Sequence, residues 1–290
     1  MRRFRSALSA LLLVVGVIAL QPVRADAQVT TQASISLMRN DYNRDGVSDL
    51  VGIRISDGCL ARWRGTGDGG FAYIGDLGCG WNAYDQLTAV GDFNRDGNGD
   101  LVAVRRSDGC LARWRGTGSF GFVYIGDYGC GWDAYYALGG AGDINGDGIG
   151  DLVAVRGSDN CLARWLGNGN GGFTYIGDYG CTWDYVLDFT GVGDINRDGR
   201  ADLLATYWDP PCFSTFAGDG ASRYYFIADY CYLLNPDAQV VGMGDINRDG
   251  NGDFVTINSG GCLERWLSDG YGNWFDTGEV GCGWSPYWIA

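Results

Sequence analysis

The residues best suited to chemistry are the oxygen-bearing side chains of a short motif that the chain repeats five times. The motif reads D-x-N-x-D-G-x-x-D, followed by leucine in four copies and by phenylalanine in the fifth, and successive copies start 51 residues apart. Its oxygens at positions 1, 3, 5 and 9 suit a hard cation such as calcium, and the glycine at position 6 allows a bend that turns them inward. The alternative is a set of Asx-type turns without metal. Three carboxylates within nine residues would repel one another without a cation, so the motif favours metal binding.

The predicted side-chain ligands are therefore the four oxygen-bearing residues of each copy. They are Asp41, Asn43, Asp45 and Asp49; Asp92, Asn94, Asp96 and Asp100; Asp143, Asn145, Asp147 and Asp151; Asp194, Asn196, Asp198 and Asp202; and Asp245, Asn247, Asp249 and Asp253.

Two rows of tryptophan recur with the same period. Trp63, Trp114, Trp165 and Trp266 occupy one position, where the fourth unit has Phe216. Trp81, Trp132, Trp183 and Trp284 follow the second cysteine of their units in glycine-rich segments. Large aromatic side chains usually pack in a core, and both rows are expected to do so. If one row instead binds ligand by stacking on sugar rings, the Trp81 row is the better candidate, because binding residues concentrate in loops.

An arginine also recurs, as Arg62, Arg113, Arg164 and Arg265. Counting residues across the predicted hairpin places Arg62 close to Asp76, which predicts a cross-strand ion pair. Ligand binding by these arginines is the alternative.

Ten cysteines fall two to a unit, and this regularity limits how they pair. The same hairpin count brings Cys59 within two residues of a position opposite Cys79, a gap that a β-bulge can close. Pairing between neighbouring units is the alternative, and a metal cluster fits poorly because no C-x-x-C pair occurs. The predicted within-unit disulfides are Cys59–Cys79, Cys110–Cys130, Cys161–Cys181, Cys212–Cys231 and Cys262–Cys282.

The elements that must position these residues are short strands. In the second unit, apolar runs at 87–91, 101–105, 110–115 and 122–125 are separated by glycine-rich turns, and no helical period is present. Four strands per repeat of this length are typical of a propeller blade. We predict an all-β, five-bladed propeller of antiparallel blades with units 36–86, 87–137, 138–188, 189–239 and 240–290. A β-solenoid, or a blade count altered by strand exchange between the chain ends, is the alternative.

The beginning of the chain resembles a signal peptide. Arg2, Arg3 and Arg5 precede an apolar run at 7–20, and Ala25–Ala27 form an A-x-A-like cleavage site. We predict a signal peptide at 1–27, cleaved after Ala27, and a short lead-in at 28–35. The sequence leaves open whether export uses the general secretory or the twin-arginine route. The mature protein is predicted to be secreted, without membrane insertion.

Charge and composition narrow the possible partners and activities. Without residues 1–27 the chain has 17 basic and 34 acidic residues, which makes nucleic acid an unsuitable partner. The chain has no histidine or lysine, no G-x-S-x-G motif and no evident nucleophile–base set. We therefore expect no enzymatic activity. Glycoside hydrolysis by two carboxylates is the remaining catalytic alternative.

The repeated aspartate motif, preceded by glycine in units two to five, resembles the FG-GAP/VCBS-type repeat of integrin α heads and many bacterial secreted proteins. The resemblance covers all five units. It implies a β-propeller with about one calcium ion per blade, held in the loop between the first two strands. It also implies that the main-chain carbonyl at position 7 is a ligand. These residues are Val47, Asn98, Ile149, Arg200 and Asn251. The paired cysteines and the number of units depart from the family pattern.

These observations predict a secreted, calcium-binding propeller that acts as a non-catalytic binding module for a glycan or an extracellular protein. A structural or adhesive surface protein without a small-molecule site is the alternative. The oligomeric state and the ligand are not predicted.

Overall fold

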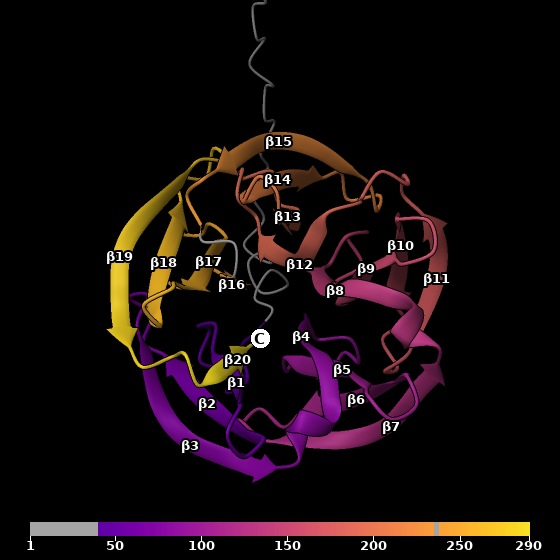
Figure 1. The fold of residues 1–290 in the computed structure, drawn as a ribbon, viewed down its shortest axis with the longest axis horizontal. Helices are drawn as coiled ribbons and strands as arrows, with labels where there is room; N and C mark the ends of the chain where they lie inside the picture. Colours follow the sequence, from indigo (N-terminus) through magenta and orange to yellow (C-terminus); the bar gives the residue numbers. More distant parts are fainter. Residues whose placement is uncertain (1–39, 235–237) are drawn as a thin grey trace, which may run out of the picture.

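The computed structural model describes residues 40–234 and 238–290. The predicted signal peptide and lead-in lie outside the described residues. Within those residues, twenty strands form five four-stranded antiparallel sheets, which are arranged like blades around a central axis (Figure 1). The predicted five-bladed propeller is therefore confirmed.

Each blade runs from an inner strand at the axis to an outer strand at the rim. Blade one contains β20 (Tyr287–Ile289), β1 (Leu50–Arg54), β2 (Cys59–Gly65) and β3 (Phe71–Cys79). Blade two contains β4 (Tyr84–Gly91), β5 (Asp100–Arg105), β6 (Cys110–Gly116) and β7 (Phe122–Cys130). Blade three contains β8 (Tyr135–Gly142), β9 (Asp151–Arg156), β10 (Cys161–Gly167) and β11 (Phe173–Asp178). Blade four contains β12 (Val186–Gly193), β13 (Asp202–Tyr207), β14 (Cys212–Gly218) and β15 (Tyr224–Cys231). Blade five contains β16 (Gln239–Gly244), β17 (Asp253–Ile257), β18 (Cys262–Ser268) and β19 (Trp274–Cys282). Two 3₁₀ turns, η1 (Trp81–Ala83) and η2 (Trp132–Ala134), follow β3 and β7.

The ring is closed by the last strand of the chain. β20 lies in the fifth sequence unit, but it pairs with β1 and completes blade one, with Gly52 opposite Ile289. Ala290 N–H donates to the Val51 carbonyl at 2.9 Å. Figure 1 shows yellow β20 beside indigo β1. Strand exchange between the two ends thus joins the first and last units without changing the number of blades.

The core lies between neighbouring blades, because the middle strands are apolar on both faces. β5 and β9 are buried along almost their whole length, whereas the outer strand β7 is mostly exposed. One cluster brings Val102 of blade two against Leu152 and Trp165 of blade three. Inner strands approach very closely where glycine removes the side chain. A Cβ on Gly139 would lie 2.2 Å from the Phe189 carbonyl of the next blade.

All five disulfides link the two cysteines of one unit, as predicted. Four of them join the third and fourth strands of a blade, and in blade three Cys181 lies just beyond the end of β11. Cys59 lies directly opposite Cys79, and two bulges separate this pair from the turn. Each bulge adds one residue to the outer strand, which accounts for the offset of two in the simple count. Disulfides of this kind are typical of proteins in oxidising compartments.

In the described part of the chain, no helix has the length and apolar character needed to cross a membrane.

Candidate functional site

The five aspartate loops each lead directly into the second strand of their blade and have closely similar conformations. In blades two to five the loop connects the first strand to the second, whereas in blade one the first strand is β20 from the other end of the chain. In the second loop, the Asp92 carboxylate accepts hydrogen bonds from Asp96 N–H at 3.1 Å and Gly97 N–H at 2.7 Å. Asn94 Oδ1 accepts a further bond from Asp96 N–H at 2.9 Å. Gly97 has a φ of 82°, as the bend at position 6 requires. The other four loops have a position-6 glycine with φ between 79° and 88°.

The ninth residue of each loop is a buried aspartate that connects the loop to the sheet. Asp100 has no exposed surface. One oxygen accepts from Phe93 N–H at 3.2 Å, and the other accepts from Gly116 N–H of β6 at 2.7 Å. Burial raises the pKa of Asp100 to about 8, although these two amides oppose the shift. A carboxylate in this position is stabilised as an anion if a cation lies beside it.

The same geometry recurs in every blade. Burial raises the pKa to about 8 at three more of these aspartates and well above its usual range at the last. They are Asp49, Asp151 and Asp253, and then Asp202.

The donor set of each loop therefore fits a hard cation. Side-chain oxygens at positions 1, 3, 5 and 9 and the carbonyl at position 7 are the ligand types that calcium prefers. Without a cation, burial disfavours the charged form of the ninth carboxylate. The predicted ligand residues thus offer the oxygen atoms that a calcium ion needs. The bound ion would supply the positive charge that balances the buried carboxylate.

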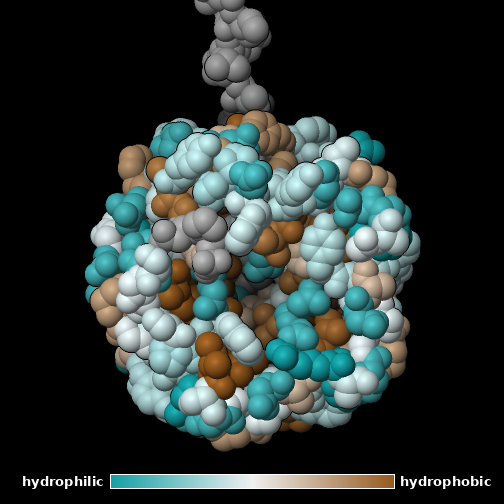
Figure 2. Space-filling model, viewed as in Figure 1, coloured by the Kyte–Doolittle hydropathy of each residue, from teal (hydrophilic) through white to brown (hydrophobic). Residues whose placement is uncertain are grey.

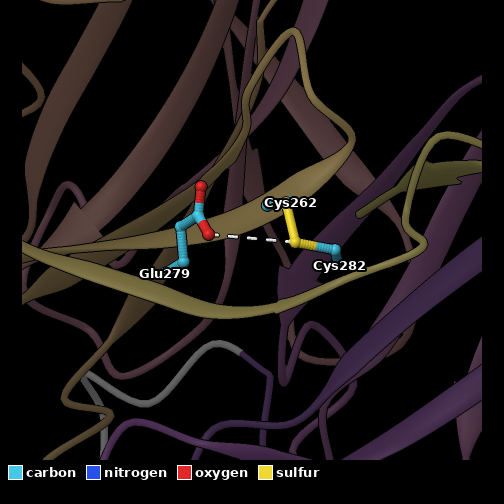
Figure 3. A group of neighbouring side chains, drawn as sticks. All are labelled: Cys262, Glu279 and Cys282. Carbon is cyan, nitrogen blue, oxygen red and sulfur yellow. Dashed lines mark hydrogen bonds between the residues drawn. A yellow bond between two sulfur atoms is a disulfide. The ribbon is translucent and has the colours of Figure 1, made fainter.

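A different group of potential ligands is closer together but unsuited to metal. In the described residues, Cys262, Glu279 and Cys282 form the one group of three such side chains whose ligand atoms lie within 4.8 Å of one another (Figure 3). Both sulfur atoms belong to the blade-five disulfide. Neither can act as a thiolate, and the group is not a metal site.

Neighbouring aspartate loops contact each other directly. The Asp92 carbonyl accepts from Gly150 N–H of the next loop at 3.1 Å, and Asp41 and Asp194 accept in the same way from the loops that follow them. Arg44 of the first loop also donates to Asn98 Oδ1 of the second at 2.6 Å. The five loops lie at the same end of their blades, and these bonds link several of them around the ring.

The tryptophans considered as a sugar platform are buried. Trp81, Trp132, Trp183 and Trp284 are 6–9% exposed. Trp81 packs on Trp114 of the next blade with ring centroids 4.8 Å apart, and Trp284 packs on Trp63 at 4.6 Å. Trp63, Trp114, Trp165 and Trp266 are also buried. In this structure both rows form contacts between blades, and we do not place the ligand site on the Trp81 row.

The recurring arginines are also contacts between blades, and the predicted ion pair of Arg62 with Asp76 is wrong. Arg62 donates to the carbonyls of Gly75 at 3.2 Å and Asp76 at 3.3 Å, and to Phe120 of the next blade at 2.8 Å. The carboxylate of Asp76 pairs with Arg54. Carbonyls are the better partners because the side chain of Arg62 reaches across the bulged strand to the neighbouring turn.

Blade four lacks this arginine and replaces its hydrogen bond. Thr215 occupies the position, and Tyr230 donates its hydroxyl to the Gly272 carbonyl of blade five at 2.8 Å. The carbonyls equivalent to that of Gly272 accept from arginine at the two preceding blade boundaries. Gly171 of blade three accepts from Arg113 of blade two, and Ser222 of blade four accepts from Arg164 of blade three.

The boundary between blades four and five contains a cavity of about 400 Å³. Leu233 occupies the position that carries tryptophan after the second cysteine of the other blades. No tryptophan therefore covers Trp266 of blade five at this boundary. The cavity is lined by Tyr232, Leu233, Leu234, Ala238, Thr256, Asn258, Glu264, Trp266 and Asp276.

Sequence reasoning did not identify these residues as a site. The available signal was the set of departures from the repeat, namely Glu264, where units one to three have alanine, and the missing tryptophan in unit four. Only the ring arrangement shows that both departures face the same space.

Comparisons with known proteins agree with the repeat pattern. The FG-GAP-like repeat model matches residues 92–154 and 143–205. Both matches begin at the first aspartate of a loop and end just beyond the ninth residue of the next loop. No protein with curated annotation matches the chain.

Several solved structures are distantly similar. A lectin from Agrocybe aegerita, described as recognising non-reducing terminal N-acetylglucosamine, is 19% identical with a TM-score of 0.43, over 86% of this chain and 69% of the lectin. A protein of unknown function from Desulfotomaculum acetoxidans is 11% identical with a TM-score of 0.43, over 81% of this chain and 66% of that one. The periplasmic gluconolactonase PpgL of Pseudomonas aeruginosa is 14% identical with a TM-score of 0.40, over 85% and 71%.

The matched repeats, the five equivalent loops and the closed ring together identify the chain as a five-bladed β-propeller built with FG-GAP-like repeats.

Proposed function

We propose that the protein is an exported, calcium-loaded propeller that binds a glycan or protein ligand without chemically changing it. The observation that carries the calcium part is the buried ninth aspartate of every loop. Its two oxygens accept backbone amides from the loop and from the third strand. A calcium ion beside it would offset both its burial and the repulsion from the two other aspartates of the loop.

Residues 41–49 and their four equivalents would hold the ions by the oxygens named above. In this proposal calcium is structural. It would fix the loop that leads into the second strand of each blade, and the hydrogen bonds between loops would extend this effect to neighbouring blades. The five disulfides support a site of action outside the cell.

The binding part of the proposal is supported by the cavity between blades four and five, which combines aromatic, apolar and acidic residues. Concave sites of this mixed character are typical of ligand binding. The lack of histidine and lysine from the chain supports a role without general acid–base catalysis.

The direct test is a binding screen of the protein starting at Gln28 against arrays of glycans and extracellular proteins. It is run in buffer with calcium and again with excess chelator. We expect specific binding that weakens in chelator, with the bound ligand recovered unchanged. Turnover of the ligand, or binding to no member of either array, would contradict the proposed binding function.

A further inference from the structure

Blade five differs from blades one to three at a cluster of charged positions. In blade one, the Asp76 carboxylate is paired with Arg54 and accepts a hydrogen bond from the Tyr73 hydroxyl at 2.7 Å. Arg105 with Asp127 and Arg156 with Asp178 repeat this arrangement in blades two and three. Each acid in this row is therefore accompanied by a base.

At the corresponding positions blade five has acids and no base. Asn258 occupies the position of the paired arginine of blades one to three, and Glu279 occupies the position of the paired aspartate. Asp276 replaces the tyrosine opposite the tryptophan, and Glu264 replaces an alanine. Three carboxylates thus occupy a region that is electrically balanced in blade one.

Two of these acids face each other directly. Glu264 of β18 is paired in register with Glu279 of β19. Like charges placed opposite one another on a sheet are destabilising. The Asn258 amide donates to Glu264 at 2.7 Å and to Glu279 at 3.2 Å, which orients both carboxylates but leaves their charge unbalanced. Figure 3 shows Glu279 beside the disulfide that ends this hairpin.

The same region borders the cavity. Glu264 and Asp276 line it together with Trp266, and Leu233, Leu234 and Ala238 give it an apolar side. Trp266 is 5% exposed, and its indole N–H has no hydrogen-bond partner in the described residues. An acidic region, an aromatic surface and apolar residues therefore border one space.

We propose that this cavity binds a lysine or arginine side chain of a polypeptide ligand. The proposal rests on the binding function proposed above and gives it a site and a ligand class. The ammonium or guanidinium group would lie beside Glu264 and Glu279 and supply the missing positive charge. Its aliphatic stem would pack along Leu233 and Trp266, as the stems of these side chains do on apolar surfaces. A neutral sugar would leave the opposed carboxylates uncompensated, so the charge pattern favours the cation.

The test uses calorimetric titration of the calcium-loaded protein with Nα-acetyl-lysine amide and Nα-acetyl-arginine amide. Nα-acetyl-norleucine amide, which keeps the aliphatic stem but lacks the charge, is the matched neutral probe. We expect the two cationic probes to bind one to one and at least tenfold more tightly than the neutral probe. Glucosamine is titrated as a separate cationic probe, and we expect it to bind at least tenfold more weakly than the lysine derivative.

Two variants locate the binding. Glu264→Ala restores the residue of blades one to three and is expected to weaken binding of the lysine derivative at least tenfold. Leu233→Trp restores the tryptophan of the other blades and is expected to fill the cavity and abolish binding. Asp184→Asn removes an exposed carboxylate outside the cavity and should leave binding unchanged. Melting curves of all three variants establish that each is folded.

Several outcomes would overturn this proposal. They are equal affinity for the neutral probe, no binding of either amino-acid derivative, tighter binding of glucosamine, and unchanged binding in folded Glu264→Ala and Leu233→Trp. If calcium titrated into the cavity displaces the lysine derivative, and Glu264→Ala loses that extra ion, the cavity is a metal site instead. If the array screen still finds a ligand while the lysine derivative does not bind, this proposal fails and the proposed binding function stands.

Discussion

At the scale of single residues, the ninth aspartate of each loop has a structural role in addition to its predicted role as a metal ligand. Asp100 joins three segments, because its carboxylate receives amides from the loop and from β6 while it begins β5 itself. The first, third and fifth residues of the loop bond mainly within the loop. Loss of the ninth residue should therefore affect both the metal and the fold.

We expect Asp100→Asn to lose one calcium ion and to lower the free energy of unfolding by about 1–3 kcal/mol, since an amide group cannot accept both buried N–H bonds. Chemical denaturation and elemental analysis measure the two effects. Asp108→Asn is the matched control, because Asp108 is an exposed partner of Arg105. It should cost at most about 1 kcal/mol and keep every ion. Equal behaviour of the two variants would refute the role given to Asp100.

Residue types were easier to predict than residue partners. The ligand oxygens follow from the motif, but the partner of Arg62 depends on bulges that shift the register and on the turn of the next blade. The burial of Trp81 likewise depends on Trp114, 33 residues later in a different sheet. A glycine-rich segment around a tryptophan does not reveal which surface covers its ring.

At the scale of elements, the strands follow closely from the sequence because apolar runs alternate with glycine-rich turns. The runs expected at 101–105 and 110–115 correspond to β5 and β6. The pairing of β20 with β1 could not be assigned from the repeat, because nothing in residues 287–289 identifies which end strand they join.

Deleting residues 287–290 should destabilise the ring. The deletion removes the buried Ile289, worth about 1.5–3 kcal/mol, and exposes the edge of β1. We expect a lower melting temperature and association that increases with protein concentration, measured by calorimetry and light scattering. Trp288→Ser is the control, because it removes a partly exposed side chain and keeps the strand. A truncated protein that melts like the parent and stays monomeric at all concentrations would show that β20 does not hold the ring closed.

At the scale of the whole molecule, the repeat predicts the number of blades and the equivalence of their loops. It does not predict the boundary between blades four and five, because a repeat describes what units share. Tyr230 there replaces the arginine contact, whereas the smaller Leu233 occupies the position of the missing tryptophan. One boundary has therefore kept its polar contact between blades and gained a cavity. This asymmetry is the reason to look for one ligand site in place of five equal ones.

The central claim is that all five loops hold calcium in the folded protein. Native mass spectrometry of the chain starting at Gln28, with melting curves recorded before and after excess chelator, tests it most directly. We predict five calcium ions per chain, their loss in chelator, and a lower melting temperature in the metal-free protein, because calcium would bind only the folded loops. A chain that carries no calcium and melts at the same temperature with and without chelator would contradict it.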